Sequence, residues 1–500
     1  MDVKEKSYQN VNGKKWTVMV YLAGSNNLVE EMVFAVRELR GKATTKIVNV
    51  FVEFDTGSDV WRFPPSAFEA KPNEDPDRIE NIDLEKLGKK QRYPPLLNTR
   101  GILRRFVTEV MSASPDTEHY ALILSGHGSG AVGDFLTGST PGLTIPALGS
   151  TFDRVKEELA KGGHSRGGNG VKLFDILGLD SCTMSMAEIG YEVEGHVHHM
   201  IGAEGFELNA GWPYDRLIRL DLRKPVPELV LDIVQTYCDY YFNYSIGDLS
   251  TDQSAINLDR FSDILKPVVR KLAEALSNGL NDQSARDRIL MAHWYAQSYK
   301  TEQYTDLWDF CNELTKRFPE GDDILTAAAQ VQKAIEGVVT LSTYSGARFQ
   351  HSHGIAIFFP WADIVDSKGG HDLSAYKRLK FANQTKWADF LKHYFERTKR
   401  LPRQGEGEKR TSHLNARPGI FGSLAEVKGG GAEDSKGTED SQGFFPDEAK
   451  GGGSEDSKGG GAEDSKSGLF LPNLKIGQMK NPPTDWFRLD LTKERGRNAG

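Results

Sequence analysis

Apolar and polar residues follow a repeating order along roughly the first two hundred positions. Short, almost continuously apolar runs begin at Trp16 and Ile47 and end at Ser125 and Asp180. Between them, segments such as NNLVEEMVFAVRELRG and ALGSTFDRVKEELAKGG space apolar residues three and four apart, as amphipathic helices do. Strands that are apolar on both faces and alternate with helices indicate a sheet covered on both sides. The pattern therefore predicts an α/β fold, an α/β/α sandwich with a largely parallel central sheet.

The later part of the chain has a different pattern. The segments RFSDILKPVVRKLAEALSNG and DLWDFCNELTKRF predict helices, VVTLSTYSG and HGIAIFFP predict strands, and KWADFLKHYFERTKR predicts a last helix near Arg400. We expect an N-terminal extension over residues 1–15 and a globular domain over 16–397. Its first half, about 16–215, contains the strand–helix repeats, and its second half, about 216–397, is mostly helical with late strands.

The composition changes after this domain. Residues 398–467 contain GGGAEDSK-type repeats with few apolar side chains, which predicts a flexible linker. Residues 468–500 include SGLFLPNLKIGQMKNPPTDWFRLDL, whose aromatic and aliphatic residues a pure spacer does not need. We expect this peptide to dock, either on the same chain or on a partner.

Charge and cysteine content narrow the function classes. Lys and Arg number 62 against 70 Asp and Glu, a net charge of −8, and no strongly basic block occurs, so a nucleic-acid partner is not expected. Three cysteines, Cys182, Cys238 and Cys311, do not form a disulfide framework or a metal-binding spacing. No apolar run predicts a secretory signal or a membrane span, so we expect a cytoplasmic protein without a membrane partner.

Two of the predicted strands end in reactive groups. LILSGHGSG places His127 between glycines, and DILGLDSCTMS places Cys182 just after an apolar strand. Functional sites of such sheets lie beyond the carboxyl ends of the strands. A cysteine peptidase needs a thiolate to attack the carbonyl carbon and an imidazole to transfer the proton. The sequence therefore predicts Cys182 as nucleophile and His127 as its acid–base partner.

The surroundings of both residues support this hypothesis. The backbone N–H groups of Gly128 and Cys182 are the predicted oxyanion donors. The segment TMSMAEIGYEV predicts a helix opening at Cys182, whose N-terminus would lower the pKa of the thiol. His127 precedes Cys182 by 55 positions, room for one strand–helix–strand crossover and the order known for caspases.

Asp180 is the candidate specificity residue. Residues i and i+2 of a strand point to the same side, so the Asp180 carboxylate would emerge beside Cys182 and pair with Arg or Lys at P1. Asp180 and Ser181 could instead be helix N-caps. Likewise, Cys182 could be a small core residue and His127 a loop residue. Core packing is the prediction for Cys238 and Cys311.

Several blocks resemble those of clostripain-like cysteine peptidases, relatives of caspases, gingipains and legumains. They are WTVMVYLAGSNNL, LILSGHGSG, FDILGLDSCTMSMAEIGYEV and GAEGFELNAGWPYD, followed by YTDLWDFCNEL, HSHGIAIFFP and FANQTKWADFLKHYF. The resemblance covers about residues 16 to 397. It implies a caspase-hemoglobinase-like fold, a dyad of His127 and Cys182, and specificity for Arg or Lys governed by Asp180.

The resemblance also implies further properties. Self-processing at basic residues between the dyad blocks is one, and Ca²⁺ dependence occurs in the family, although no calcium-loop motif is present. The chain has Gly126 where such proteins often carry an acid. The block AEGFELNAGWPY lacks the usual proline but keeps Glu204 and Glu207, which we expect to line the substrate cleft.

Regulation is expected because an Arg- or Lys-specific cytoplasmic protease needs gating. The Gly-rich segment AKGGHSRGGNG joins the two dyad strands, and in this 161–170 loop Lys161 and Arg166 are the self-cleavage candidates, unless the segment is an inert surface loop. The C-terminal peptide is expected to occupy the cleft or to bind a regulatory protein, unless it is only a spacer.

The sequence thus predicts a cysteine endopeptidase acting on polypeptides with Arg or Lys at P1, a zymogen with autocatalytic cleavage and no certain cofactor. Two alternatives stay open. One is a catalytically silent caspase-like scaffold that recruits partners through its tail. The other is a latent protease activated within a signalling or defence cascade.

Overall fold

The structure is a computed structural model. It describes residues 11, 14–57, 59–70, 84–91, 98–138, 142–244, 250–300, 302–365 and 372–398, and two short strands at 403–404 and 488–489. Most of the predicted linker and of the predicted docking peptide therefore lies outside the described residues.

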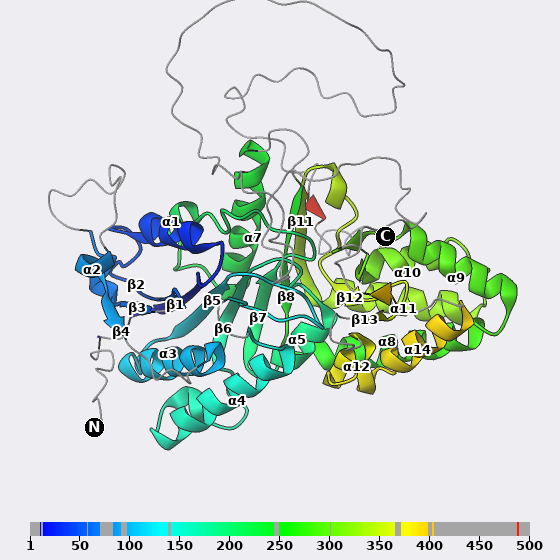
Figure 1. Cartoon of the computed structure of the whole chain (residues 1–500), viewed down its shortest axis with the longest axis horizontal. Helices are drawn as coiled ribbons and strands as arrows, with labels where there is room; N and C mark the ends of the chain where they lie inside the picture. The colour runs from blue at the N-terminus through cyan, green and yellow to red at the C-terminus, as the bar shows by residue number, and fades with distance from the viewer. Residues whose placement is uncertain are drawn as a thin grey trace, which may run out of the picture.

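A ten-stranded sheet forms the centre of the described part, in the order β15-β11-β8-β7-β6-β5-β1-β2-β3-β4 (Figure 1). The five middle strands from β7 to β2 are parallel, and the pairs toward both edges are antiparallel. The strands are β1 Trp16–Ala23, β2 Val48–Asp55, β3 Val60–Phe63, β4 Lys89–Gln91, β5 His119–Ser125, β6 Phe174–Asp180, β7 Val197–Gly202, β8 Thr251–Asn257, β11 Val339–Ser345 and β15 Arg488–Leu489. The predicted largely parallel α/β sheet is confirmed.

Helices cover both faces of this sheet, as the apolar strands require. In Figure 1, α3, α4 and α5 lie on one side, and α1 and α7 lie on the other. All residues of β2 and β6 are buried. The helices are α1 Val29–Leu39, α2 Leu84–Leu87, α3 Thr99–Ala113, α4 Ile145–Lys161, α5 Ala187–Val193, α6 Tyr214–Leu217 and α7 Val226–Tyr244.

The second half of the chain adds both strands to this sheet and a helical group beside it. Strands β8 and β11 extend the sheet, and a smaller sheet has the order β12-β10-β9. One apolar core runs from the α3–α5 face into the helical group. The remaining elements are α8 Phe261–Gly279, α9 Gln283–Tyr295, β9 Ser298–Tyr299, β10 Tyr304–Asp306, α10 Leu307–Thr315, α11 Asp323–Val338, β12 Ala356–Phe358, β13 Ile364–Val365, α12 Asp372–Tyr376, α13 Lys380–Gln384, α14 Trp387–Arg397 and β14 Arg403–Gln404.

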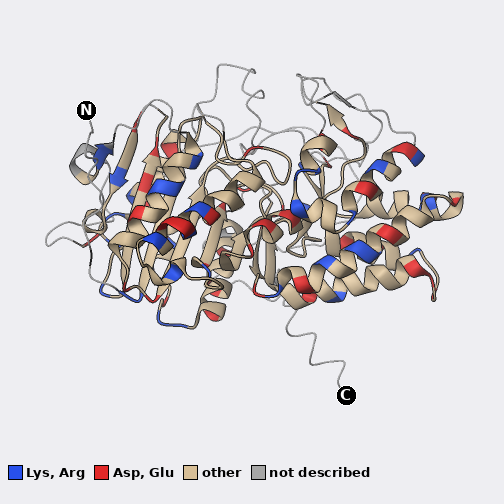
Figure 2. Cartoon of the chain, turned by 90° about the horizontal axis from the view of Figure 1, so that it is seen from below, with Lys and Arg blue, Asp and Glu red and all other residues tan. Residues whose placement is uncertain are grey.

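Charges are mixed over the described part of the chain. Figure 2 shows Lys and Arg interspersed with Asp and Glu along helices and strands, without a face of one sign. Among the described residues, no helix combines the length and the apolar character that crossing a membrane requires. Two residues of the predicted docking peptide, Arg488 and Leu489, pair antiparallel with Thr343 and Ser342 of β11.

Candidate active site

The register of β5 and β6 brings the predicted dyad residues to one edge of the sheet. Ser125 pairs with Asp180 at the carboxyl ends of these parallel neighbours. His127 and Cys182 each lie two residues beyond that pair. Gly128 packs directly on the second turn, because a Cβ at Gly128 would collide with the Cys182 carbonyl oxygen. The structure thus places the two residues in adjacent, contacting turns.

His127 is held from the turn that follows β1. Its Nε2 lies 2.7 Å from Oδ1 of Asn27. Its carbonyl accepts a hydrogen bond from the Leu136 N–H at 2.8 Å, and the residue is 8% exposed. Sequence reasoning missed Asn27, although the letters GSNN at the end of an apolar strand were the available signal.

Cys182 lies in a turn and not at a helix N-terminus. Helix α5 begins only at Ala187, so the predicted helical stabilisation of the thiolate is wrong. The physical reason is that Thr183 adopts a left-handed backbone with φ of 56°, and its N–H donates to the Gly205 carbonyl at 2.8 Å. The chain after the nucleophile is therefore bound to another segment before a helix can start.

Residues 203–214, here called the cover segment, lie over the thiol. The Glu207 N–H donates to Cys182 Sγ at 3.3 Å, and Sγ lies 3.6 Å from the Glu207 carbonyl oxygen. Cys182 has 0% exposure. In this conformation the nucleophile is covered by protein and closed to an incoming polypeptide.

The cover segment also holds Asp180. The Trp212 N–H donates to Asp180 Oδ1 at 3.1 Å, and the Tyr214 hydroxyl donates to Oδ2 at 3.0 Å. Burial, and after it the Asp180 charge, raises the pKa of Tyr214 well above its usual value. Asp180 ends β6, and the N-cap of α5 is Met186, which makes no side-chain cap, so the N-cap alternative for Asp180 and Ser181 is wrong.

Glu207 lies in the same group, and its side chain is fully buried. Its Oε1 accepts hydrogen bonds from Gln253 Nε2 at 3.1 Å and Trp212 Nε1 at 3.4 Å. The carboxylates of Glu207 and Asp180 thus share contacts with Trp212, on the cover segment beside Cys182.

Glu204 faces the second half of the chain. Its Oε2 accepts a hydrogen bond from the Gly354 N–H at 2.6 Å. Burial raises the pKa of Glu204 well above its usual value, and the nearby Asp306 and Asp252 add to this effect. This carboxyl group links the cover segment to the loop before β12.

A further acid near Asp180 was missed by sequence reasoning. Glu38 on α1 accepts a hydrogen bond from the Tyr214 N–H at 3.1 Å. Burial raises the pKa of Glu38 to about 8, and Asp215 and Asp180 contribute to the rise. Its position in an amphipathic helix gave no signal that would separate it from a surface acid.

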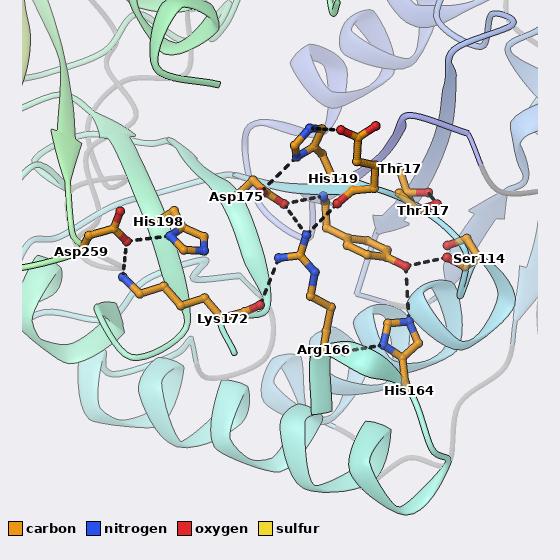
Figure 3. A network of polar contacts seen from close by, with 12 residues as sticks. Thr17, Ser114, Thr117, His119, His164, Arg166, Lys172, Asp175, His198 and Asp259 are labelled. Atoms are coloured by element: carbon orange, nitrogen blue, oxygen red, sulfur yellow. Dashed lines mark hydrogen bonds and ion pairs between the residues drawn. The ribbon is translucent and has the colours of Figure 1, made fainter. Parts of the chain in front are cut away.

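The self-cleavage candidates lie at the opposite, amino edge of the sheet. Arg166 Nη2 donates to Asp175 Oδ2 at 2.9 Å and to the Glu118 carbonyl at 2.8 Å, and Nη1 donates to the Lys172 carbonyl at 3.2 Å (Figure 3). Asp175 lies at the start of β6, whose seven residues span about 20 Å. Lys161 is the exposed last residue of α4.

The other two cysteines are core residues, as predicted. Cys238 and Cys311 are buried, and burial raises the pKa of both thiols. Within the described ranges no group of three or more His, Cys, Asp and Glu side chains could hold a metal ion. The described residues therefore do not fit the calcium site that the family resemblance suggested.

Comparison with known proteins agrees with this geometry. The model of the clostripain family matches residues 20–394. A secreted C11 cysteine protease from Bacteroides thetaiotaomicron, in complex with an irreversible peptide inhibitor, is similar in fold with a TM-score of 0.51 and 15% identity over 75% of this chain and 99% of that chain. A second structure of a secreted C11 cysteine protease from Bacteroides thetaiotaomicron, "iotapain", gives a TM-score of 0.50 at 15% identity, with the same coverage of both chains.

No match to the chain was found among curated proteins. The family match covers most of the described domain, and the structural likeness supports the caspase-like α/β/α fold. The chain belongs to the clostripain family and is a cysteine peptidase that acts on polypeptides.

Proposed function

We propose that the chain is a cysteine endopeptidase with Cys182 as nucleophile and His127 as acid–base partner, cleaving after Arg or Lys. One observation carries the proposal: the two residues follow a register pair of adjacent parallel strands, with Gly128 packed on the Cys182 carbonyl. Two distant parts of the sequence thereby supply a thiol and an imidazole to one sheet edge.

Each group has a defined part in the reaction. The Cys182 sulfur attacks the peptide carbonyl carbon after its proton passes to His127, and the imidazolium then protonates the leaving amine. Water attacks the acyl-enzyme, and the carbonyl carbon–sulfur bond breaks. The N–H groups of Gly128 and Cys182 are the proposed donors to the oxyanion.

Asp180 is the proposed P1 selector, with Glu207 beside it. Both carboxylates are buried and receive hydrogen bonds from the N–H and O–H groups of Trp212, Tyr214 and Gln253. A guanidinium or ammonium group that replaces such a neutral donor gains a charge-assisted hydrogen bond. A neutral P1 side chain gains no such bond. Glu204 contributes by fixing the cover segment to Gly354 and lines no part of the cleft in this closed conformation.

The closed site makes the protein a latent enzyme in this proposal. The cover segment bonds to Cys182 and to Asp180 at once, so a substrate reaches either group only after residues 203–214 move. A signalling or defence cascade whose component displaces this segment would activate the protease.

A fluorogenic peptide series tests the function. Substrates with Arg, Lys, Gln or Leu at P1 are incubated with the full chain under reducing conditions, and Cys182→Ala is the control. The proposal expects hydrolysis of the Arg and Lys peptides by the wild type only. Hydrolysis that survives Cys182→Ala, or that favours Leu, contradicts it.

Self-cleavage is proposed at Lys161, with Arg166 as the second candidate. Lys161 is exposed, whereas the Arg166 guanidinium makes three hydrogen bonds. No Lys or Arg occurs between residues 128 and 153, so the chain next to His127 offers no basic cleavage site. Because both candidates lie far from the dyad of their own chain, the cut is intermolecular. Mass spectrometry should show two fragments from the wild type, with a rate that rises with protein concentration, and one intact chain from Cys182→Ala.

The tail and the environment complete the proposal. The C-terminal peptide regulates activity by docking on the domain or by binding a regulatory partner, so deleting residues 401–500 should raise hydrolysis or abolish a complex. The enzyme is proposed to act in the cytoplasm, and fractionation of the native host tests this. Adding calcium or a chelator to the peptide assay tests the dependence that occurs in the family.

A catalytically silent scaffold is the second candidate function. The observation that favours it is the 0% exposure of Cys182. It predicts that the wild type hydrolyses no peptide with or without its tail, yet retains a partner complex that truncation at residue 400 removes.

A further inference from the structure

The turn between β1 and α1 is fastened on several sides. The Gly24 N–H donates to the Asp55 carbonyl at 2.8 Å, and Asn26 Oδ1 accepts from the Leu28 N–H at 2.8 Å. Asn26 Nδ2 donates to the Thr137 carbonyl at 2.6 Å, which binds the turn to the segment that follows His127. A fastened turn presents its next side chain in a fixed place.

Asn27 is that side chain. Strand β1 is a parallel neighbour of β5, with Leu22 paired to Ser125, so the turns after both strands lie side by side. Asn27 is exposed, and its Oδ1 reaches His127 Nε2 at 2.7 Å. An exposed residue that bonds to a buried imidazole has little packing role to explain its position.

The chemistry of the amide fixes the imidazole. An amide oxygen only accepts hydrogen bonds, so the nitrogen that faces it, Nε2, carries the proton. The lone pair of the neutral ring is then on the buried Nδ1. This tautomer leaves Nδ1 as the nitrogen that can take the thiol proton, and the Nε2–H bond persists when the ring becomes charged.

We propose that Asn27 is the positioning residue of the dyad, holding His127 in the tautomer and the orientation that proton transfer from Cys182 needs. The inference rests on the proposed function. It assigns Asn27 no contact with the substrate, and its effect therefore falls on kcat and not on KM.

The test compares Asn27→Ala, Asn27→Asp and Asn26→Ala in the full chain. Asn27→Ala should lower kcat roughly tenfold to a hundredfold, part of the hundred- to ten-thousandfold that acid–base transfer contributes, with KM within about twofold. Asn27→Asp restores an acceptor and should recover most of kcat. Because a carboxylate stabilises the imidazolium, the limb of the pH–rate profile that reports His127 should move to higher pH. Asn26→Ala keeps the acceptor and should lower the melting temperature without moving that limb.

Nitrogen NMR of labelled histidine, assigned with His127→Gln, gives a second readout that needs no turnover. The wild type and Asn26→Ala should show the Nε2–H tautomer, and Asn27→Ala a mixture. An unchanged tautomer and an unchanged kcat in Asn27→Ala overturn the inference, as does an Asn26→Ala variant that reproduces both losses. If the wild type hydrolyses no peptide, the proposed function fails while the NMR result still decides the role of Asn27.

Discussion

The two edges of the central sheet both carry histidines and acids but arrange them differently. At the amino edge, Asp175 meets Arg166 at 2.9 Å and His119 at 3.2 Å, so its partners are cations or groups that become cations (Figure 3). At the carboxyl edge, Asp180 receives its hydrogen bonds from a backbone N–H and a hydroxyl. The first arrangement compensates charge, and the second only solvates it.

This difference separates structural charges from functional ones. An acid beside neutral donors keeps its attraction for an incoming cation, whereas an acid with an arginine has already used it. Consistently, burial and neighbouring acids raise the pKa of Glu38 to about 8 near Asp180. The carboxyl edge is thus prepared for a positively charged ligand, and the amino edge is already satisfied.

The largest expected effect comes from removing the thiol at the carboxyl edge. Cys182→Ala should lower kcat/KM for an Arg peptide by at least about a thousandfold, because no other group supplies the nucleophile. Cys311→Ala is the matched control, since it also removes a fully buried thiol, but from α10. It should keep the activity and lose only stability in a melting experiment. Equal losses in both variants would show that burial, and not chemistry, decides.

The second expected effect concerns the acids at the two ends of β6. Asp180→Asn should reduce the preference for Arg over Gln at P1 by roughly a hundredfold, about 2.7 kcal/mol, because the charge-assisted bond is lost. Asp175→Asn changes the acid at the amino end of the same strand and should leave this preference unchanged. Competition between the two peptides measures it directly. A preference that follows Asp175 would reverse the comparison.

The third effect is on stability at the amino edge. Arg166→Met removes a side chain that is 14% exposed from an Asp175 that is 12% exposed. Leaving a half-buried carboxylate without its arginine should cost about 2 kcal/mol of unfolding free energy in urea titrations. Activity after full activation should not change. If hydrolysis and self-processing disappear together while stability stays constant, Arg166 is a processing site and not an anchor.

Much of this arrangement could be predicted from the sequence. Apolar runs ending in GHG and DSC identified β5 and β6, and the rule that sites lie at carboxyl ends placed His127 and Cys182 together. Both signals are local in the sequence. They therefore needed no knowledge of how distant segments pack.

The rest depended on contacts between distant segments. The left-handed turn at Thr183 exists because its N–H bonds to Gly205, and no local pattern contains that partner. Hydrophobic spacing in TMSMAEIG therefore favoured a helix that starts five residues too early. Asn27 and Glu38 act through His127 and Tyr214, which lie far along the chain, so their sequence neighbourhoods show only a turn and an amphipathic helix.

The smallest effect tests whether the acids at the carboxyl edge are strained by burial. With a pKa of about 8 in the folded chain against 4.5 for the ordinary carboxyl, Glu38 keeps its proton in the folded state at pH values where the unfolded chain has lost it. Folding therefore takes up a proton, and stability should fall as pH rises from about 4.5 to 8 and then level off, by at most about 1.4 kcal/mol per pH unit. Glu38→Gln should remove this contribution, giving a shallower loss of unfolding free energy between pH 5.5 and 7.5. Glu30→Gln, an exposed change on the same helix, should keep the wild-type slope. Identical slopes for the wild type and Glu38→Gln would mean that the acid is already compensated, and the contrast between the two edges would then rest on Asp180 alone.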